Sequence, residues 1–136
     1  MVQGNNRILV VDDNPAICRS LVIFLERQGF DVMAAAEYTR ALELVELELF
    51  DALIADLDLP GGTGIDLLAT ARMLRPRMLS ILITGYGCTA IRKQAEQLDL
   101  TAYLEKPFDG GELLEALRSE PSKRSYSLSS SGSRTS

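Results

Sequence analysis

Five short apolar runs, each followed by an amphipathic stretch, constrain the fold of this chain more than any other feature. The runs cover residues 7–13, 30–36, 51–56, 79–84 and 102–105. The stretches after them carry apolar residues at helical spacing, at about 15–28, 38–48, 65–74, 89–98 and from 110 onward. Strands that are apolar throughout and alternate with helices are typical of a parallel sheet covered on both faces.

The order of these elements predicts an α/β fold, a doubly wound five-stranded parallel sheet flanked by five helices. This is the flavodoxin-like (βα)5 arrangement, in which ligands bind at the carboxyl ends of the strands. Asn14 and Pro15 suit the cap and first turn of a helix, and Gly29 suits its end. Asp109 and Glu112 have the spacing of a capping box.

The composition divides the chain into two parts. Residues 1–120 hold 11 basic and 19 acidic side chains, a net charge of −8. Residues 121–136 are half serine and carry three basic residues and no acidic one. We expect 1–120 to form one folded domain and 121–136 to be a flexible Ser-rich tail. The negative charge of the folded part argues against direct nucleic-acid binding by this domain.

The chain contains no histidine, and this absence excludes several kinds of site. Ser-His-Asp and Cys-His nucleophiles are ruled out, as is zinc bound by Cys and His. We expect Cys18 and Cys88 to be unpaired and buried. Any metal must then be bound by carboxylate and carbonyl oxygens, which favours a hard cation.

No apolar run approaches the length of a membrane span. The first residues, MVQGNNR, lack the layout of a signal peptide. We therefore expect a cytoplasmic protein without a membrane partner.

Polar side chains stand where four of the predicted strands end. Asp12 and Asp13 follow the first strand, Asp56 ends the third, Thr84 ends the fourth and Lys106 follows the fifth. The carboxyl ends of parallel strands share one edge of the sheet, so these side chains can converge. Crowded carboxylates repel one another unless a cation compensates them. Mg²⁺ suits a site with few carboxylates, several waters and an incoming phosphate oxygen.

Such a cluster favours phosphoryl transfer. Asp56 would be the attacking carboxylate. Lys106 would pair with Asp56 in the empty site and with a phosphoryl oxygen in the loaded one. The hydroxyl of Thr84 would donate to another phosphoryl oxygen.

Four motifs, ILVVDDNP, DLDLPGGTG, ILITGYG and YLEKPF, follow one another along the chain. Their order and spacing resemble those of the response-regulator receiver domains of two-component signal transduction, the CheY-like family. The resemblance covers about residues 6–120. The Asp-Asp pair alone would be weak, but its combination with the other motifs is highly specific.

The resemblance implies a role for each matching residue. Mg²⁺ would be bound by Asp12, Asp13, Asp56 and the backbone carbonyl of Asp58. Asp56 would accept the phosphoryl group, and Thr84 and Lys106 would bind it.

The resemblance also implies a conformational switch. The peptide between Lys106 and Pro107 would be cis. Phosphorylation would draw Thr84 inward and let the ring of Tyr103 follow, which would remake the surface of the fourth helix, fifth strand and fifth helix. The donor would be a histidine kinase or phosphotransfer protein, and the output a protein partner or a homodimer. The domain would not be an enzyme, beyond its own phosphorylation and dephosphorylation.

Three alternatives stay open at this point. Asp56-Leu57-Asp58 also resembles the start of haloacid-dehalogenase-type phosphatases, although Pro60 departs from that pattern. The domain could instead bind partners without phosphorylation, or be the receiver part of a larger regulator. Two features depart from common receivers. Leu100-Thr101 stand before the fifth strand, where they would alter the end of the fourth helix, and the acid at Asp58 would affect the lifetime of the acyl phosphate.

Overall fold

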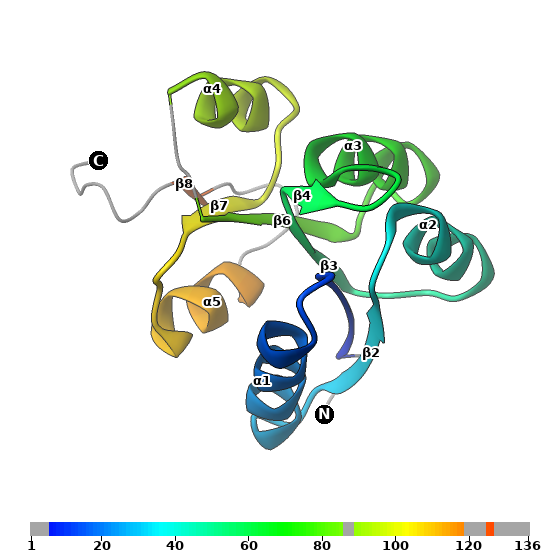
Figure 1. The fold of residues 1–136 in the computed structure, drawn as a ribbon, viewed down its shortest axis with the longest axis vertical. Coiled ribbons are helices and arrows are strands. Elements are labelled where there is room, and N and C mark those ends of the chain that lie inside the picture. Colours follow the sequence, from blue (N-terminus) through cyan, green and yellow to red (C-terminus); the bar gives the residue numbers. More distant parts are fainter. Residues whose placement is uncertain (1–5, 86–88, 119–124, 127–136) are drawn as a thin grey trace.

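A parallel sheet forms the centre of the computed structural model, which describes residues 6–85, 89–118 and 125–126 (Figure 1). Its strand order is β2-β1-β3-β6-β7-β8. The strands are β1 Arg7–Val11, β2 Asp31–Ala35, β3 Ala52–Asp56, β6 Leu79–Thr84, β7 Ala102–Glu105 and β8 Ser125–Tyr126. All neighbouring pairs in this sheet are parallel. From β1 the chain first adds β2 on one side of the sheet and then adds the later strands on the other side. This change of direction confirms the predicted doubly wound α/β fold.

Within the described part of the chain, five helices cover the two faces of the sheet. They are α1 Pro15–Arg27, α2 Tyr38–Leu47, α3 Gly64–Leu74, α4 Thr89–Gln97 and α5 Gly110–Leu117. Helices α1 and α5 lie on one face, and α2, α3 and α4 lie on the other (Figure 1). Each face has its own apolar cluster, because alternate residues of every strand point to opposite sides. No helix among the described residues is long and apolar enough to cross a membrane.

The predicted helix ends agree with the structure. The side chain of Asn14 accepts hydrogen bonds from the backbone N–H groups of Ala16 and Ile17. The side chain of Asp109 accepts from the N–H of Glu112 at 2.9 Å. Gly29 follows α1 with a φ of 100°, a conformation that glycine adopts without strain.

Leu49 continues the apolar spacing of the stretch predicted at 38–48, which predicts that it faces the core, but the structure exposes it. It is 69% exposed, because α2 ends at Leu47 and the helical periodicity stops there. Leu44, five positions earlier on α2, is buried.

A short antiparallel hairpin follows β3, in the segment that contains the motif DLDLPGGTG. It pairs β4 Asp58–Leu59 with β5 Gly62–Thr63. Tyr38 holds this hairpin, since its N–H donates to the carbonyl of Pro60 at 3.1 Å. Its ring covers Gly62 so closely that a Cβ there would lie 2.6 Å from Cδ2 of Tyr38.

Strand β8 is the second addition to the predicted architecture. It comes from the Ser-rich segment and extends the sheet beyond the five expected strands. Its backbone pairs with β7 at Ala102 and Tyr103. The other residues of 121–136 and Cys88 lie outside the described part of the chain.

Candidate functional site

Three carboxylates gather at the carboxyl edge of the sheet. Asp12 and Asp13 follow β1, and Asp56 is the last residue of the adjacent strand β3. One oxygen from each side chain lies within 4.8 Å of the other two. Asp12 is buried at 4% exposure, whereas Asp13 is exposed. The sequence placed these three residues at one edge, and the structure brings their oxygens together.

Lys106 faces two of these carboxylates. Its Nζ lies 3.4 Å from Oδ1 of Asp56 and 3.8 Å from Oδ2 of Asp12. The lysine follows β7, and its backbone N–H donates to the carbonyl of Thr84 at 2.8 Å. The Lys106–Pro107 peptide is cis. This backbone contact places Lys106 beside the end of β6, where the buried Thr84 stands.

The orientation of Asp12 is fixed by the start of α1. Its Oδ1 accepts a hydrogen bond from the N–H of Asn14 at 2.9 Å. The other oxygen, Oδ2, is the one that faces Lys106. The turn between β1 and α1 therefore sets how this buried carboxylate enters the site.

Burial raises the pKa of the Asp56 carboxyl above its ordinary value. The positive charge of Lys106 and its hydrogen bond act in the opposite direction, and the negative charges of Asp12 and Asp58 add to the rise. The same environment acts on Cys18, a free, half-buried thiol whose pKa is raised by burial and by Asp12. The site thus holds excess negative charge that one lysine does not balance.

These donors fit a hard divalent cation. Carboxylate oxygens are the ligands that such cations prefer, and a magnesium-type ion binds through few protein ligands while it keeps several waters. The exposed side of the cluster at Asp13 leaves room for those waters. A cation would also relieve the repulsion among the three carboxylates.

The backbone after Asp56 is held by close contacts that the sequence did not reveal. The N–H of Leu57 donates to the carbonyl of Ile83 at 2.9 Å. The carbonyl of Leu57 accepts a hydrogen bond from the N–H of Gly64 at 2.7 Å. A Cβ at Gly64 would lie 2.1 Å from the carbonyl oxygen of Asp56. Only glycine allows α3 to begin so near the acidic cluster, and the motif PGGTG was the available signal.

Tyr103 lies within β7, and Thr101 stands just before the amino end of that strand, at the end away from the acidic cluster. Tyr103 is 2% exposed and its hydroxyl donates to Oε2 of Glu105 at 3.2 Å. Thr101, one of the departures from common receivers, is buried, and its Oγ1 accepts from the N–H of Ser80 at 2.9 Å. The unusual threonine therefore ties the start of β7 to β6.

A carboxylate cluster with a lysine thus lies at the carboxyl edge of a doubly wound sheet, where ligands bind in this fold. The chain belongs to the response regulator receiver domain family, whose model matches residues 8–118. It is thus a receiver domain of two-component systems.

Curated relatives support this assignment. The response regulator protein PilR of Pseudomonas aeruginosa is 36% identical over 82% of this chain, which spans 25% of PilR. The acid tolerance regulatory protein ActR of Rhizobium meliloti is 31% identical over 91% of this chain and 64% of its own length. The sporulation initiation phosphotransferase F of Bacillus subtilis is 29% identical, with 84% of this chain and 92% of that protein covered. The chain therefore spans only a part of two of these three relatives.

Solved structures show the same fold. A CheY-like receiver domain protein from Methanospirillum hungatei has a TM-score of 0.80 and 36% identity, over 85% of this chain and 92% of that one. A response regulator from Burkholderia pseudomallei, with a phosphorylated aspartic acid, calcium ion and citrate, has a TM-score of 0.80 and 33% identity. That likeness covers 87% of this chain and 69% of the other.

Proposed function

We propose that this domain accepts a phosphoryl group on Asp56 from a histidine kinase or a phosphotransfer protein. Mg²⁺ would be held by Asp12, Asp13, Asp56 and the backbone carbonyl of Asp58. The observation that carries the proposal is the position of Lys106, whose Nζ lies 3.4 Å from the Asp56 carboxylate inside the acidic cluster. A lysine there supplies the positive charge that an arriving phosphoryl group needs.

The transfer forms one bond and breaks one. A carboxylate oxygen of Asp56 bonds to phosphorus while the bond between phosphorus and the donor's histidine nitrogen breaks, and the electron pair leaves with that nitrogen. Lys106 moves from pairing with Asp56 to pairing with a phosphoryl oxygen, and the hydroxyl of Thr84 donates to another. Mg²⁺, when bound, neutralises the charge that develops on the phosphoryl oxygens. The domain would act only on its own phosphoryl group.

The output surface would be that of α4, β7 and α5. Thr84 ends β6 and the buried Tyr103 lies on the adjacent strand β7. A displacement of Thr84 toward the phosphoryl group would free space near the ring of Tyr103 and change this surface. We propose that the changed surface binds a protein partner or a second copy of the domain, and that the acidic domain does not bind nucleic acid directly.

The first test is intact-protein mass after incubation with acetyl phosphate and Mg²⁺. We expect one added phosphoryl group in the wild type and none in Asp56→Asn. The adduct should also be lost when the metal is chelated.

Two results would contradict the proposal. If the wild type gained no phosphoryl group from acetyl phosphate or from a phosphorylated histidine donor, the domain would bind partners without phosphorylation. Steady hydrolysis of unrelated phosphomonoesters would instead indicate a phosphatase.

A further inference from the structure

Exposed apolar side chains gather at the ends of α2 and α3. Among the described residues, five large apolar side chains are exposed. Four belong to these two helix ends, namely Leu47 at 74%, Leu49 at 69%, Met73 at 82% and Leu74 at 39% exposure. The fifth, Ile23, lies on α1. Such a concentration on one corner of a small domain is typical of an interaction surface rather than of scattered surface leucines.

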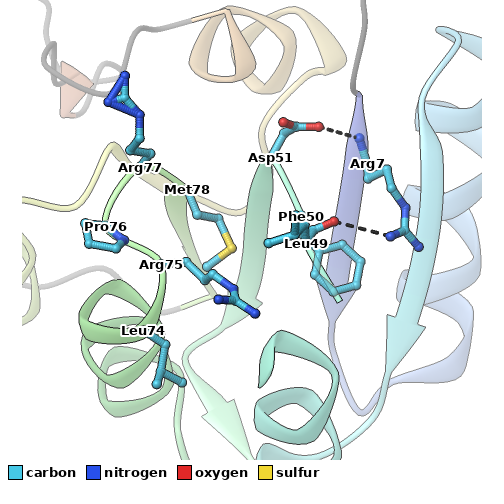
Figure 2. Close-up of a pocket in the computed structure, with 9 residues that line it drawn as sticks. All are labelled: Arg7, Leu49, Phe50, Asp51, Leu74, Arg75, Pro76, Arg77 and Met78. Carbon is cyan, nitrogen blue, oxygen red and sulfur yellow. Dashed lines mark hydrogen bonds between the residues drawn. The ribbon is translucent and has the colours of Figure 1, made fainter. Parts of the chain in front are cut away.

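A pocket of about 710 Å³ opens beside these side chains (Figure 2). Leu49 and Leu74 line it together with Phe50, Pro76 and Met78. Its walls come from the segments just before β3 and β6, at the amino ends of the strands. The pocket therefore lies at the edge of the sheet opposite the one that holds Asp56, and it can accept a large apolar side chain.

The α3 side of this corner is basic. Residues 67–95 contain no acidic residue, although residues 1–120 carry a net charge of −8. Among the residues that the structure describes, Arg72 and Arg75 donate only to the backbone carbonyls of Asp99 and Glu46, respectively. Nε of Arg75 is buried and has no hydrogen-bond partner within the described part of the chain. Arg77 points away from the other side chains that line the pocket (Figure 2).

Of the four carboxylates on the α2 side of this corner, three are engaged, whereas the exposed Glu46 forms no ion pair within the described part of the chain. Glu43 pairs with Arg40 on the same helix. Glu48 pairs with Arg7 at 2.7 Å, and Asp51 accepts from the backbone N–H of Arg7. The three arginines at residues 72–77 therefore outnumber the free acid beside them, which favours an acidic partner over the same corner of a second copy.

We propose that this corner, lined by residues 47–51 and 72–78, docks an acidic segment of a partner protein. One large apolar side chain of that segment fills the pocket between Phe50 and Met78. Flanking carboxylates face Arg75 and Arg77, where they supply the acceptors that the domain lacks. Because the corner lies at the opposite edge from Asp56, the segment binds whether or not Asp56 is phosphorylated.

The test is a titration of the ¹⁵N-labelled 136-residue chain with a synthetic helical peptide, acetyl-EELLEELFEEL-amide, followed by NMR. We expect chemical-shift changes confined to residues 47–51 and 72–78. Met73→Ser and Arg77→Glu each change an exposed side chain and should weaken binding at least tenfold. Ile23→Ser and Arg118→Glu make the same changes elsewhere and should leave it unchanged, as should Asp56→Asn.

Other results would overturn the inference. Absence of shifts, or shifts centred on another surface, would show that the corner does not take an acidic segment. Equal binding of the analogue with lysine in place of glutamate would remove the role of the arginines. Sedimentation of the free chain as a dimer that Met73→Ser dissociates would assign the corner to a second copy. Since phosphorylation is measured separately on Asp56, the failure of either proposal leaves the other standing.

Discussion

The ammonium of Lys106 lies 3.4 Å from the carboxylate of Asp56, a residue fifty positions earlier in the chain. This contact lowers the pKa of Asp56, but burial and the neighbouring acids leave that pKa above its ordinary value. The native state thus keeps an ionised carboxylate in surroundings that disfavour its charge. The three carboxylates could therefore accept an additional cation, which would relieve this unfavourable charge.

The raised pKa of Asp56 gives a pH-dependent difference between wild type and Asp56→Asn. The folded state binds the proton of this group more tightly than the unfolded state does, so the contribution of the group to stability falls as pH rises above 3.8. We expect Asp56→Asn to be the more stable protein at pH 7 without metal, and the gap to close toward pH 3.8. Urea unfolding of both proteins across this pH range measures the difference. A stability difference that widens toward acidic pH would contradict the prediction.

Mg²⁺ should stabilise the domain through the same carboxylates. An ion that binds only the folded state at one hundred times its Kd adds about 2.7 kcal/mol to the free energy of unfolding. We expect Asp13→Asn to lose most of this gain. Asp58→Ala is the matched control, because the proposed ligand there is the backbone carbonyl. Thermal unfolding with and without Mg²⁺ measures the stabilisation by the ion in both variants. If Asp58→Ala lost as much of this stabilisation as Asp13→Asn, the proposed ligand set would be wrong.

Gly64→Ala should destabilise the domain by at least about 2 kcal/mol, the scale of overpacking against an atom that cannot move freely. The new Cβ would lie 2.1 Å from the carbonyl oxygen of Asp56, which is backbone. Gly85→Ala adds the same methyl group where no atom of the described residues lies within 4 Å, and it should change stability by no more than about 0.5 kcal/mol. Urea midpoints compare the two variants. Equal effects would show that α3 can shift at little cost.

Alanine substitutions at Thr101 and at Ser80 should have different effects on the stability of the domain. Thr101→Ala leaves the buried N–H of Ser80 without the acceptor it has at 2.9 Å, and should cost about 1–3 kcal/mol. Thr101→Ser keeps the acceptor and should cost less. Among the described residues the buried Oγ of Ser80 has no hydrogen-bond partner, so Ser80→Ala should be neutral or stabilising. Destabilisation by Ser80→Ala comparable to that of Thr101→Ala would show that the hydroxyl has a partner after all.

The fold could be predicted from the sequence because periodicity, caps and strand ends agreed with one another. The acidic cluster followed from the same pattern, since Asp12, Asp13 and Asp56 end adjacent strands. Contacts that depend on side-chain packing could not be predicted. Spacing does not show that Lys106 also approaches Asp12, nor that Thr101 bonds to Ser80.

The errors in the prediction have equally local causes. Leu49 continued the apolar period of α2 in the sequence, but the helix ends two residues earlier. The hairpin after β3 has only two residues in each strand, too few to show an alternating pattern. Strand β8 lies in a serine-rich segment that has no strand pattern at all, and its pairing depends on the open edge of β7.

The contact between Tyr38 and Gly62 has a consequence for how related sequences diverge. A Cβ at position 62 would lie 2.6 Å from the ring of Tyr38, so a side chain at one position excludes a large ring at the other. These two positions should therefore covary, with homologues that replace Gly62 carrying a smaller residue at position 38. Substitution at either position alone should be rare, even though neither residue belongs to the acidic cluster.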